Sequence, residues 1–195
     1  KMFEKVSLEE FKRAYKEYFF PGQQVQIRTH PGDIDTYLKE SEKLEELWNN
    51  IRLPRRSTPQ SAGYDFHIPF TLNALPGQTY MIPTGIKANL SRICGGSYDT
   101  MGTNKPCFLA LYPRSSLGFQ YGFCMDNTVG IIDQDYYNNE GNEGHIMVGF
   151  TVQKDLKFNP GDRFFQAVIQ SYYVMKNELD PVRAIRIGGL GSTGK

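Results

Sequence analysis

The feature that most constrains the fold is the pattern after residue 51, where apolar segments are short and are separated by proline and glycine. Short runs rich in β-branched and aromatic residues are typical of strands, and the residues between them are typical of turns. Strands at this spacing indicate a sandwich or jelly roll rather than alternating strands and helices. The strands that we expect are Tyr64–Ile68, Thr79–Ile82, Gly85–Leu90, Phe108–Tyr112, Ile146–Val152 and Phe164–Tyr173.

The first fifty residues have a different pattern, which favours two helices. Ser7 and Glu10 have the spacing of a capping box at the start of the first helix, which Pro21 and Gly22 end. A second helix is expected to begin near Asp33. We expect both helices to pack against the β domain or a neighbouring subunit, through apolar residues at helical spacing: Leu8, Phe11, Tyr15 and Tyr18 in the first, and Ile34, Leu38, Leu44, Leu47 and Trp48 in the second.

Composition excludes several classes of function. The 195 residues suit one domain with a full core, and a net charge of +1 gives no footprint for nucleic acid. No apolar run approaches the roughly 18 residues that span a membrane, and the N-terminal residues lack the apolar core of a signal peptide. Three cysteines without the spacing of metal ligands (Cys94, Cys107 and Cys124) indicate a reducing compartment. We therefore expect a cytoplasmic or other intracellular protein that binds neither nucleic acid nor membrane.

The segment Asn127–Tyr136 carries the clearest chemical signal. Its β-branched residues, interrupted by Gly130, favour a buried strand or a hairpin, and a glycine inside a strand marks a bend or a close approach. Asp133 follows directly, and a carboxylate that ends a buried strand is held at the rim of a cavity, where a general base belongs. The alternative interpretation is that Asp133 is an ordinary turn residue.

Three other segments carry polar groups suited to phosphate chemistry. Asp65 lies in the first expected strand of the β domain, after a turn of small residues. Arg114 lies beside Ser115 and Ser116, and a guanidinium next to hydroxyl groups suits phosphate oxygens. The segment Gly161–Gln166 starts a late strand, and Gln166 is a candidate for positioning phosphate or water. Each segment alone is also common in ordinary loops.

The last residues form a glycine-rich tail with hydroxyl groups. Its spacing from Gly189 to Lys195 partly matches a phosphate-binding P-loop. That motif needs a strand before it, a helix after it and a Ser or Thr after the lysine. We therefore do not expect a P-loop ATPase.

Taken together and in this order, these five segments resemble the motifs of the homotrimeric deoxyuridine triphosphatase (dUTPase) family. The resemblance covers about Ile51 to Lys195 and includes Pro83–Ile86. The family hydrolyses dUTP to dUMP and pyrophosphate with Mg²⁺, on a jelly-roll trimer whose sites lie between subunits. The resemblance implies an all-β, dUTPase-like jelly roll over residues 51–182, a helical N-terminal extension over 1–50, and a flexible tail over 183–195 that closes over the active site.

The resemblance also implies roles for individual residues. Asp133 would be the base that aligns a water for attack on the α-phosphorus, with Gln166 and Asp65 also in the catalytic set. Asp65 would act near Mg²⁺ through water, with the ion held mainly by the triphosphate. Tyr136 would pack under the deoxyribose and exclude a 2′-hydroxyl. The implied substrate-binding residues are Arg114, Ser115, Ser116, Asn127, Gly130, Ile132, Tyr136, Arg186, Leu190, Gly191, Ser192 and Thr193.

The chain departs from the family pattern in several places. After Tyr136 the family has Arg-Gly-Glu, whereas Tyr137 here leads into a polar loop that extends to Gly144. Leu190 replaces an aromatic residue of the tail, and Arg186 or Arg183 would have to replace an arginine that the family has one residue before Arg186. The N-terminal helices have no counterpart in the common domain, so a protein partner for them is a hypothesis.

Two alternative functions remain at this point. The related dCTP deaminases need a glutamate on the strand after the segment Asn127–Tyr136, and Ile146–Phe150 contains none. The second alternative is a regulatory protein that binds nucleotide on a dUTPase-like core and uses its added helices to bind a partner.

Overall fold

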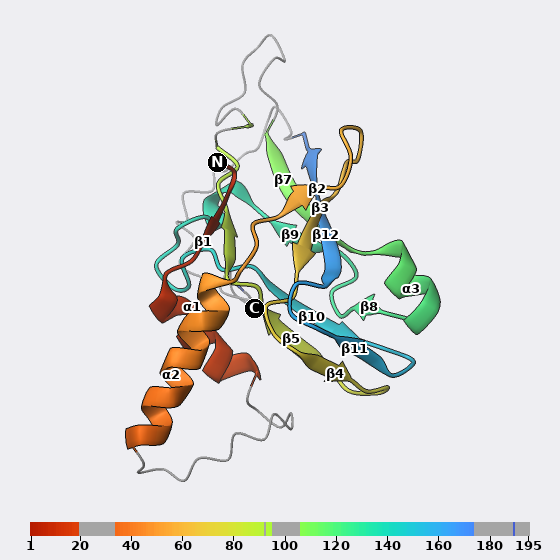
Figure 1. Ribbon diagram of the computed structural model, residues 1–195. Coiled ribbons are helices and arrows are strands. Elements are labelled where there is room, and N and C mark those ends of the chain that lie inside the picture. Colours follow the sequence, from red (N-terminus) through yellow and green to blue (C-terminus); the bar gives the residue numbers. More distant parts are fainter. Residues whose placement is uncertain (20–33, 92, 95–105, 174–188, 190–195) are drawn as a thin grey trace, which may run out of the picture.

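The computed structural model describes residues 1–19, 34–91, 93–94, 106–173 and 189 of the chain (Figure 1). Its largest sheet has five strands in the order β2-β3-β12-β7-β9, with every pairing antiparallel. These strands are β2 (Arg55–Arg56), β3 (Tyr64–His67), β7 (Cys107–Pro113), β9 (Gly130–Ile132) and β12 (Arg163–Ser171).

Smaller antiparallel sheets complete the β structure of the described residues. A three-stranded sheet has the order β5-β10-β8, and two pairs join β4 to β11 and β1 to β6. The strands are β1 (Phe3–Lys5), β4 (Leu72–Ala74), β5 (Tyr80–Pro83), β6 (Ile86–Ala88), β8 (Cys124–Met125), β10 (Met147–Thr151) and β11 (Leu156–Phe158). The expected all-β fold with N-terminal helices is confirmed.

The described helices are short except for one. They are α1 (Leu8–Ala14), continued by a π-helical turn η1 (Tyr15–Phe19), then α2 (Ile34–Asn49), α3 (Ser115–Tyr121) and the 3-10 turn η2 (Gln134–Tyr136). None of the helices in the described ranges is long and apolar enough to cross a membrane. The sequence analysis did not predict α3. It also missed the short strands β1, β2, β4, β8 and β11, because two or three residues are too few to show a period.

Phenylalanine rings join the sheets into one core. Phe66 of β3 stacks on Phe165 of β12 with ring centroids 4.3 Å apart. Phe164, the preceding residue of β12, contacts Phe158 of β11 edge to face, and Phe158 contacts Phe150 of β10 in the same way. All five rings are buried. Aromatic pairs of this geometry add to the free energy of burial, so the core fixes the sheets relative to one another.

The N-terminal residues belong to the same core. β1 pairs with β6, and Phe11 of α1 is fully buried. Leu44 of α2 is also buried, and Trp48 donates its indole N–H to the carbonyl oxygen of Val6 at 2.9 Å. Figure 1 shows both helices at one end of the sheets, where η1 contacts β5 and α1 contacts α2. The expectation that the helices pack against the β domain is confirmed.

Two of the three cysteines form a pair that the sequence did not predict. Cys94 and Cys107 are joined by a disulfide, with their Cα atoms 5.7 Å apart, and Cys124 is free and exposed. The spacing of cysteines in the sequence does not reveal which of them pair. Here the pairing depends on how β7 lies beside the segment that ends at Cys94.

Gly85 provides the space in which the N-terminal helix meets the β domain. Its φ is +71°, a conformation that favours glycine, and its carbonyl oxygen accepts the N–H of Val6 at 3.0 Å. A Cβ at this position would lie 2.2 Å from Ile51 Cδ1 and 3.3 Å from Phe11 Cδ2. Both the backbone conformation and the packing therefore require glycine.

Gly85→Ala tests this requirement against a matched control. Gly77 has a similar φ of +76°, but a Cβ there meets nothing within 4 Å. We expect Gly77→Ala to lower the free energy of unfolding by about 1–2 kcal/mol through backbone strain, and Gly85→Ala to lower it by about 1–3 kcal/mol more through overpacking. Urea denaturation measures both. Equal losses would show that the space around Gly85 does not matter.

Candidate functional site

Asp65 is the centre of a charged cluster at one end of the five-stranded sheet. The residue is buried, and its Oδ1 lies 3.2 Å from Nε of Arg114. Its Oδ2 accepts from Ser57 Oγ at 2.6 Å and from Arg163 Nη1 at 3.2 Å. Two guanidiniums and one hydroxyl therefore hold the carboxylate, which satisfies a buried charge. The sequence predicted Asp65 and Arg114 as site residues but missed Ser57 and Arg163.

Gln166 lies in the same cluster because of strand register. It is opposite Asp65 across the β12–β3 pair and opposite Tyr112 across the β12–β7 pair. Its Nε2 donates to the carbonyl oxygen of Pro113 at 3.3 Å. A Cβ on Gly63 would lie 2.2 Å from Gln166 Oε1, so the glycine of the first segment makes room for this amide. Three separate sequence segments thus meet at this sheet end.

The two predicted serines begin α3, directly after Arg114. Ser115 and Ser116 are exposed, and Arg114 is the residue that precedes the helix. Gly122 ends α3 in the left-handed conformation with a φ of +62°. The hydroxyls and the guanidinium therefore lie on one short, well-defined element at the edge of the cluster. This arrangement can bind phosphate oxygens through charge-assisted hydrogen bonds.

The segment around Gly130 is a strand, as one of the two sequence interpretations stated, but it is not a hairpin. β9 pairs with β7, whereas β8 pairs with β10 in another sheet. Burial also alternates, since Ile132 faces the core but the Ile131 side chain is 58% exposed. A Cβ on Gly130 would lie 2.9 Å from Leu111 Cδ1, so this glycine does mark a close approach. Asn127 lies in the exposed turn before β9.

Asp133 and Tyr136 lie at the two ends of the turn η2. Asp133 precedes η2, and its carbonyl oxygen accepts the N–H of Tyr136 at 3.3 Å. The Tyr136 side chain is buried, donates its hydroxyl to the carbonyl oxygen of His145 at 2.8 Å and accepts from Asn142 Nδ2 at 2.7 Å. Both predicted residues are therefore fixed by backbone geometry close to the end of β9.

The two groups of predicted residues lie at opposite ends of β7. Ile132 is in register with Leu109 near the start of β7, so Asp133 follows opposite Phe108, whereas Arg114 follows the last residue of β7. Six residues of antiparallel strand span roughly 20 Å. One chain therefore does not bring Asp133 close to the cluster around Asp65. The tail residues Arg186, Leu190, Gly191, Ser192 and Thr193 lie outside the described residues.

The described residues around Asp65 include one carboxylate suited to Mg²⁺ but not a full set of protein ligands. Within the described residues, no group of three or more His, Cys, Asp and Glu side chains could hold a metal ion. Mg²⁺ bound to nucleotides typically uses one or two protein carboxylates together with phosphate oxygens and water. Asp65, next to the phosphate-binding candidates, fits that pattern as a carboxylate that reaches the ion through water.

Comparisons with known proteins match most of the chain. The dUTPase family model matches residues 49–194. A deoxyuridine 5'-triphosphate nucleotidohydrolase of Lactococcus lactis is 38% identical over 74% of this chain and 89% of its own length, and one of Ralstonia nicotianae is 35% identical over 74% and 90%. Among solved structures, the dUTPase from Streptococcus mutans matches with a TM-score of 0.50 and 32% identity, over 66% of this chain and 91% of its own.

The first 48 residues lie outside that family match, and Glu4 and Ser7 among them contact the polar loop after Tyr136. Glu143 of this loop accepts hydrogen bonds from Ser7 N at 3.0 Å and from Ser7 Oγ at 2.5 Å. Tyr137 donates its hydroxyl to Glu4 at 2.8 Å, and Lys87 pairs with Glu143 at 3.2 Å. Two departures from the family pattern, the N-terminal extension and the loop, are thus parts of one contact.

Glu10 extends this contact into the core. Ser7 Oγ accepts the N–H of Glu10, as the capping box predicted, but the Glu10 carboxylate does not return to Ser7. It pairs instead with Arg13 and, at 3.0 Å, with Nδ1 of the buried His145. Burial would raise the pKa of Glu10, but hydrogen bonds from His145 and Arg13, together with the charge of Arg13, outweigh it and lower the pKa.

His145 is neutral and has a defined tautomer in this contact. Burial lowers its pKa despite the opposing effect of Glu10. Its Nε2 accepts the N–H of Gly85 at 2.7 Å, so the ring proton lies on Nδ1 and points to Glu10. The His145 carbonyl oxygen in turn accepts the Tyr136 hydroxyl. The N-terminal helix is therefore linked to Tyr136 through a single buried residue.

Glu10→Ala tests this link. The substitution leaves the buried Nδ1–H of His145 without an acceptor, so we expect the free energy of unfolding to fall by about 1–3 kcal/mol. Glu9→Ala removes the same charge from an exposed position of the same helix and should change it by less than about 0.5 kcal/mol. Urea denaturation of both variants gives the comparison, and similar losses would contradict the buried link.

Proposed function

Because the chain belongs to the dUTPase family, we propose that it hydrolyses dUTP to dUMP and pyrophosphate. The observation that carries the proposal is the convergence of Asp65, Arg114 and Gln166, from three separate segments, into one charged cluster. The relatives that match over most of their own length are named deoxyuridine 5'-triphosphate nucleotidohydrolases. This convergence supports a phosphate-binding role for the residues that the sequence associated with phosphate.

Asp133 is the proposed base that removes a proton from the attacking water. It directly follows β9 and precedes η2, so its backbone has little freedom to move away from a bound nucleotide. A positioned base of this kind contributes to in-line attack on the α-phosphorus by orienting the water and accepting its proton. Tyr136 is proposed to lie under the deoxyribose. Asn127 and the backbone of Gly130 and Ile132 are proposed to lie next to the uracil ring.

The cluster at the other end of β7 is proposed to bind the triphosphate. Arg114 with the hydroxyls of Ser115 and Ser116 supplies donors to phosphate oxygens, and Gln166 orients the α-phosphate or the water. Mg²⁺, held mainly by the phosphates and through water by Asp65, would neutralise charge that develops on the phosphate oxygens. Arg114 and Arg163 pair with the Asp65 carboxylate and fix its orientation.

A homotrimer with shared sites is part of this proposal. Asp133 and Arg114 follow opposite ends of β7, roughly 20 Å apart by strand rise, which is too far for both to contact one triphosphate. β9 is also an edge strand of its sheet, and the Ile131 side chain there is 58% exposed. An exposed apolar edge is suited to contact with a second copy. The base of one subunit would then complete the phosphate cluster of its neighbour.

The C-terminal tail, residues 183–195, is proposed to close over the nucleotide. Gly189 lies against Tyr136, since a Cβ on this glycine would be 2.6 Å from the tyrosine hydroxyl and 2.9 Å from Cε2. This contact supports a path of the tail past the proposed deoxyribose site. Residues on either side of Gly189 would then contact the nucleotide: Arg186, Leu190, Gly191, Ser192 and Thr193.

Asp133→Asn is the direct test of the proposed base. We expect kcat for dUTP to fall by about 10²–10⁴-fold while nucleotide binding stays nearly intact, because the amide keeps the shape but accepts no proton. Asp135→Asn, at an exposed position two residues later, is the matched control and should retain activity. Pyrophosphate release with Mg²⁺ measures turnover, with dCTP and ammonia release as a parallel assay. Half of the original activity in Asp133→Asn would show that another group is the base.

Mixed oligomers test whether the sites are shared. Asp133→Asn and Arg114→Ala should each be inactive, but co-refolded at equal amounts they should regain activity at about a quarter of the sites, where each neighbour supplies its intact half. Arg114→Ala mixed with Gln166→Ala is the control, because both changes lie in the same half and no combination restores a site. Recovery in neither mixture, or a monomer mass by light scattering for an active sample, would contradict shared sites.

A further inference from the structure

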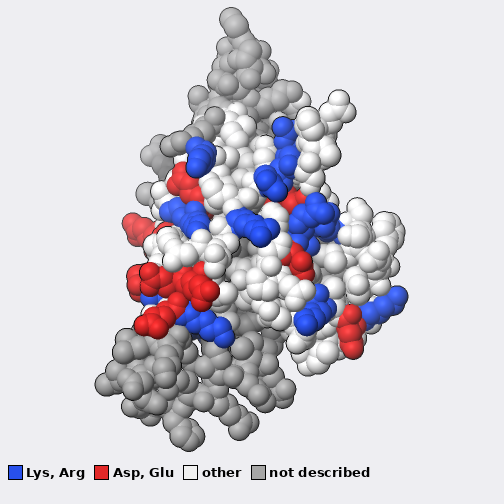
Figure 2. All heavy atoms as spheres, viewed as in Figure 1, with Lys and Arg blue, Asp and Glu red and all other residues white. Residues whose placement is uncertain are grey.

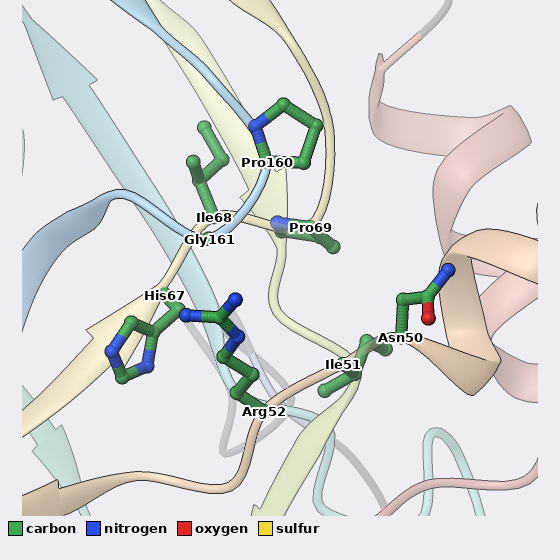
Figure 3. A pocket seen from close by; sticks show the side chains of 8 residues that line it. All are labelled: Asn50, Ile51, Arg52, His67, Ile68, Pro69, Pro160 and Gly161. Carbon is green, nitrogen blue, oxygen red and sulfur yellow. The ribbon is translucent and has the colours of Figure 1, made fainter.

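A basic cavity lies beside the charged cluster, between the segment before β2 and the start of β12. Its inner part has a volume of about 270 Å³ and is lined by the eight residues of Figure 3, among them Arg52, His67 and Gly161. A more open cleft of about 640 Å³ shares these three residues and adds Arg55 and Arg163. None of the residues that the sequence assigned to the nucleotide site lines the inner part.

The floor of the cavity is held by backbone hydrogen bonds. The N–H of Ile68 donates to the carbonyl oxygen of Asp162 at 2.9 Å, and the N–H of Gly161 donates to that of Ile68 at 2.8 Å. Gly161 has a φ of +87°, and a Cβ there would lie 3.3 Å from Cζ of Arg52. Figure 3 shows the Arg52 guanidinium between this glycine and the His67 ring. The lack of a side chain at Gly161 lets the guanidinium lie against the backbone.

Several donors in the cavity have no partner within the described residues. The guanidinium groups of Arg52 and Arg55 make no hydrogen bond or ion pair there, and the buried Nδ1 of His67 has no hydrogen-bond partner. Arg163 uses Nη1 for Ser57 and Asp65. By contrast, Asp65 is already paired with two guanidiniums. A buried polar atom without a partner has a free-energy cost, so these groups are suited to a ligand.

The charges and the size of the cavity indicate the class of that ligand. Four guanidiniums but two carboxylates line the open cleft, which leaves an excess of positive charge for a dianion: Arg52, Arg55, Arg56 and Arg163 against Asp65 and Asp162. Figure 2 shows Lys and Arg side chains gathered over β2 and β3 on this face. The inner volume is below the range of pockets for drug-sized ligands, and no Phe, Tyr or Trp lines it for stacking on a base.

We propose that this cavity is a second anion site, which binds a phosphate-class oxyanion through Arg52, Arg55 and His67. Guanidinium groups match phosphate oxygens in pairs of hydrogen bonds, and the rigid floor holds Arg52 in place for them. The site adjoins the nucleotide cluster through Arg163, which contacts Asp65. Its inner part is separate from that cluster, because no residue assigned to dUTP lines it; only the open cleft reaches Asp65, which is opposite Arg55 across the β2–β3 pair.

His67 provides a probe for occupancy. Burial lowers its pKa, and the guanidiniums of Arg52, Arg55 and Arg163 lower it further against the opposing carboxylate of Asp65. A dianion between Arg52 and Arg55 would offset their charge, so the imidazole would gain proton affinity when the site fills. The chain has three histidines, so the His67 ring resonance can be assigned with a single His67→Gln variant.

The experiment is an NMR titration of the full chain in phosphate-free buffer near pH 6.5. Inorganic phosphate, and separately pyrophosphate, should shift the His67 ring resonance to saturation, also with a non-hydrolysable α,β-imido dUTP analogue bound at the nucleotide site. Arg52→Gln combined with Arg55→Gln should weaken binding at least about tenfold, the equivalent of losing one or two charged hydrogen bonds. Lys154→Gln combined with Lys157→Gln removes the same charge elsewhere and should leave the affinity unchanged.

Each outcome decides for or against the site. Tighter binding of pyrophosphate would identify the reaction product as the source, and equal binding would identify free phosphate; both support the proposal. An unsaturable shift, loss of the shift when the analogue is bound, or equal affinities in the two double variants would overturn it. Because Arg55 is exposed, Arg55→Gln alone keeps the test valid if the double variant does not fold. The titration needs no turnover, so failure of this site and failure of the proposed hydrolysis are distinguishable.

Discussion

The pairing of β7 with two neighbours is the constraint on which the proposed site depends. On one side β12 fixes Gln166 opposite Tyr112, next to Pro113 and Arg114. On the other side β9 ends opposite the start of β7, so that Asp133 lies far from Arg114. The hydrogen bonds of one strand therefore create both halves of the proposed site and also keep them apart. The proposed association of copies would bring the two halves together.

A second constraint is the contact between the N-terminal segment and the loop after Tyr136. Ser7 of the segment binds Glu143 of the loop, and Glu10 binds His145 directly after it; the His145 carbonyl oxygen also accepts the Tyr136 hydroxyl. Hydrogen bonds to a charged group, such as those to Glu143, are stronger than neutral ones. The residues outside the family match thus stabilise the part of the chain that carries the proposed deoxyribose contact.

Guanidinium groups have two different uses on the face around β2 and β3. Arg114 and Arg163 are paired with the buried carboxylate of Asp65, whose charge they balance. Arg52 and Arg55 have no carboxylate partner within the described residues and face a cavity with a rigid backbone floor. The first pair orients a proposed catalytic group, and the second pair is available for an external anion.

The sequence by itself determined the features that depend on neighbours in the chain. It predicted the strands longer than three residues, the Ser7 cap of the first helix, and the close approach at Gly130. It also identified Asp133 as a carboxylate directly after a strand, since period and turn residues are local signals. The tertiary structure alone decided which groups meet across long separations. Asp65 with Arg163, Ser7 with Glu143 and Glu10 with His145 are each about a hundred or more residues apart. Such contacts follow from strand register and core packing, which no local pattern contains, so only the folded chain reveals where each charge finds its partner.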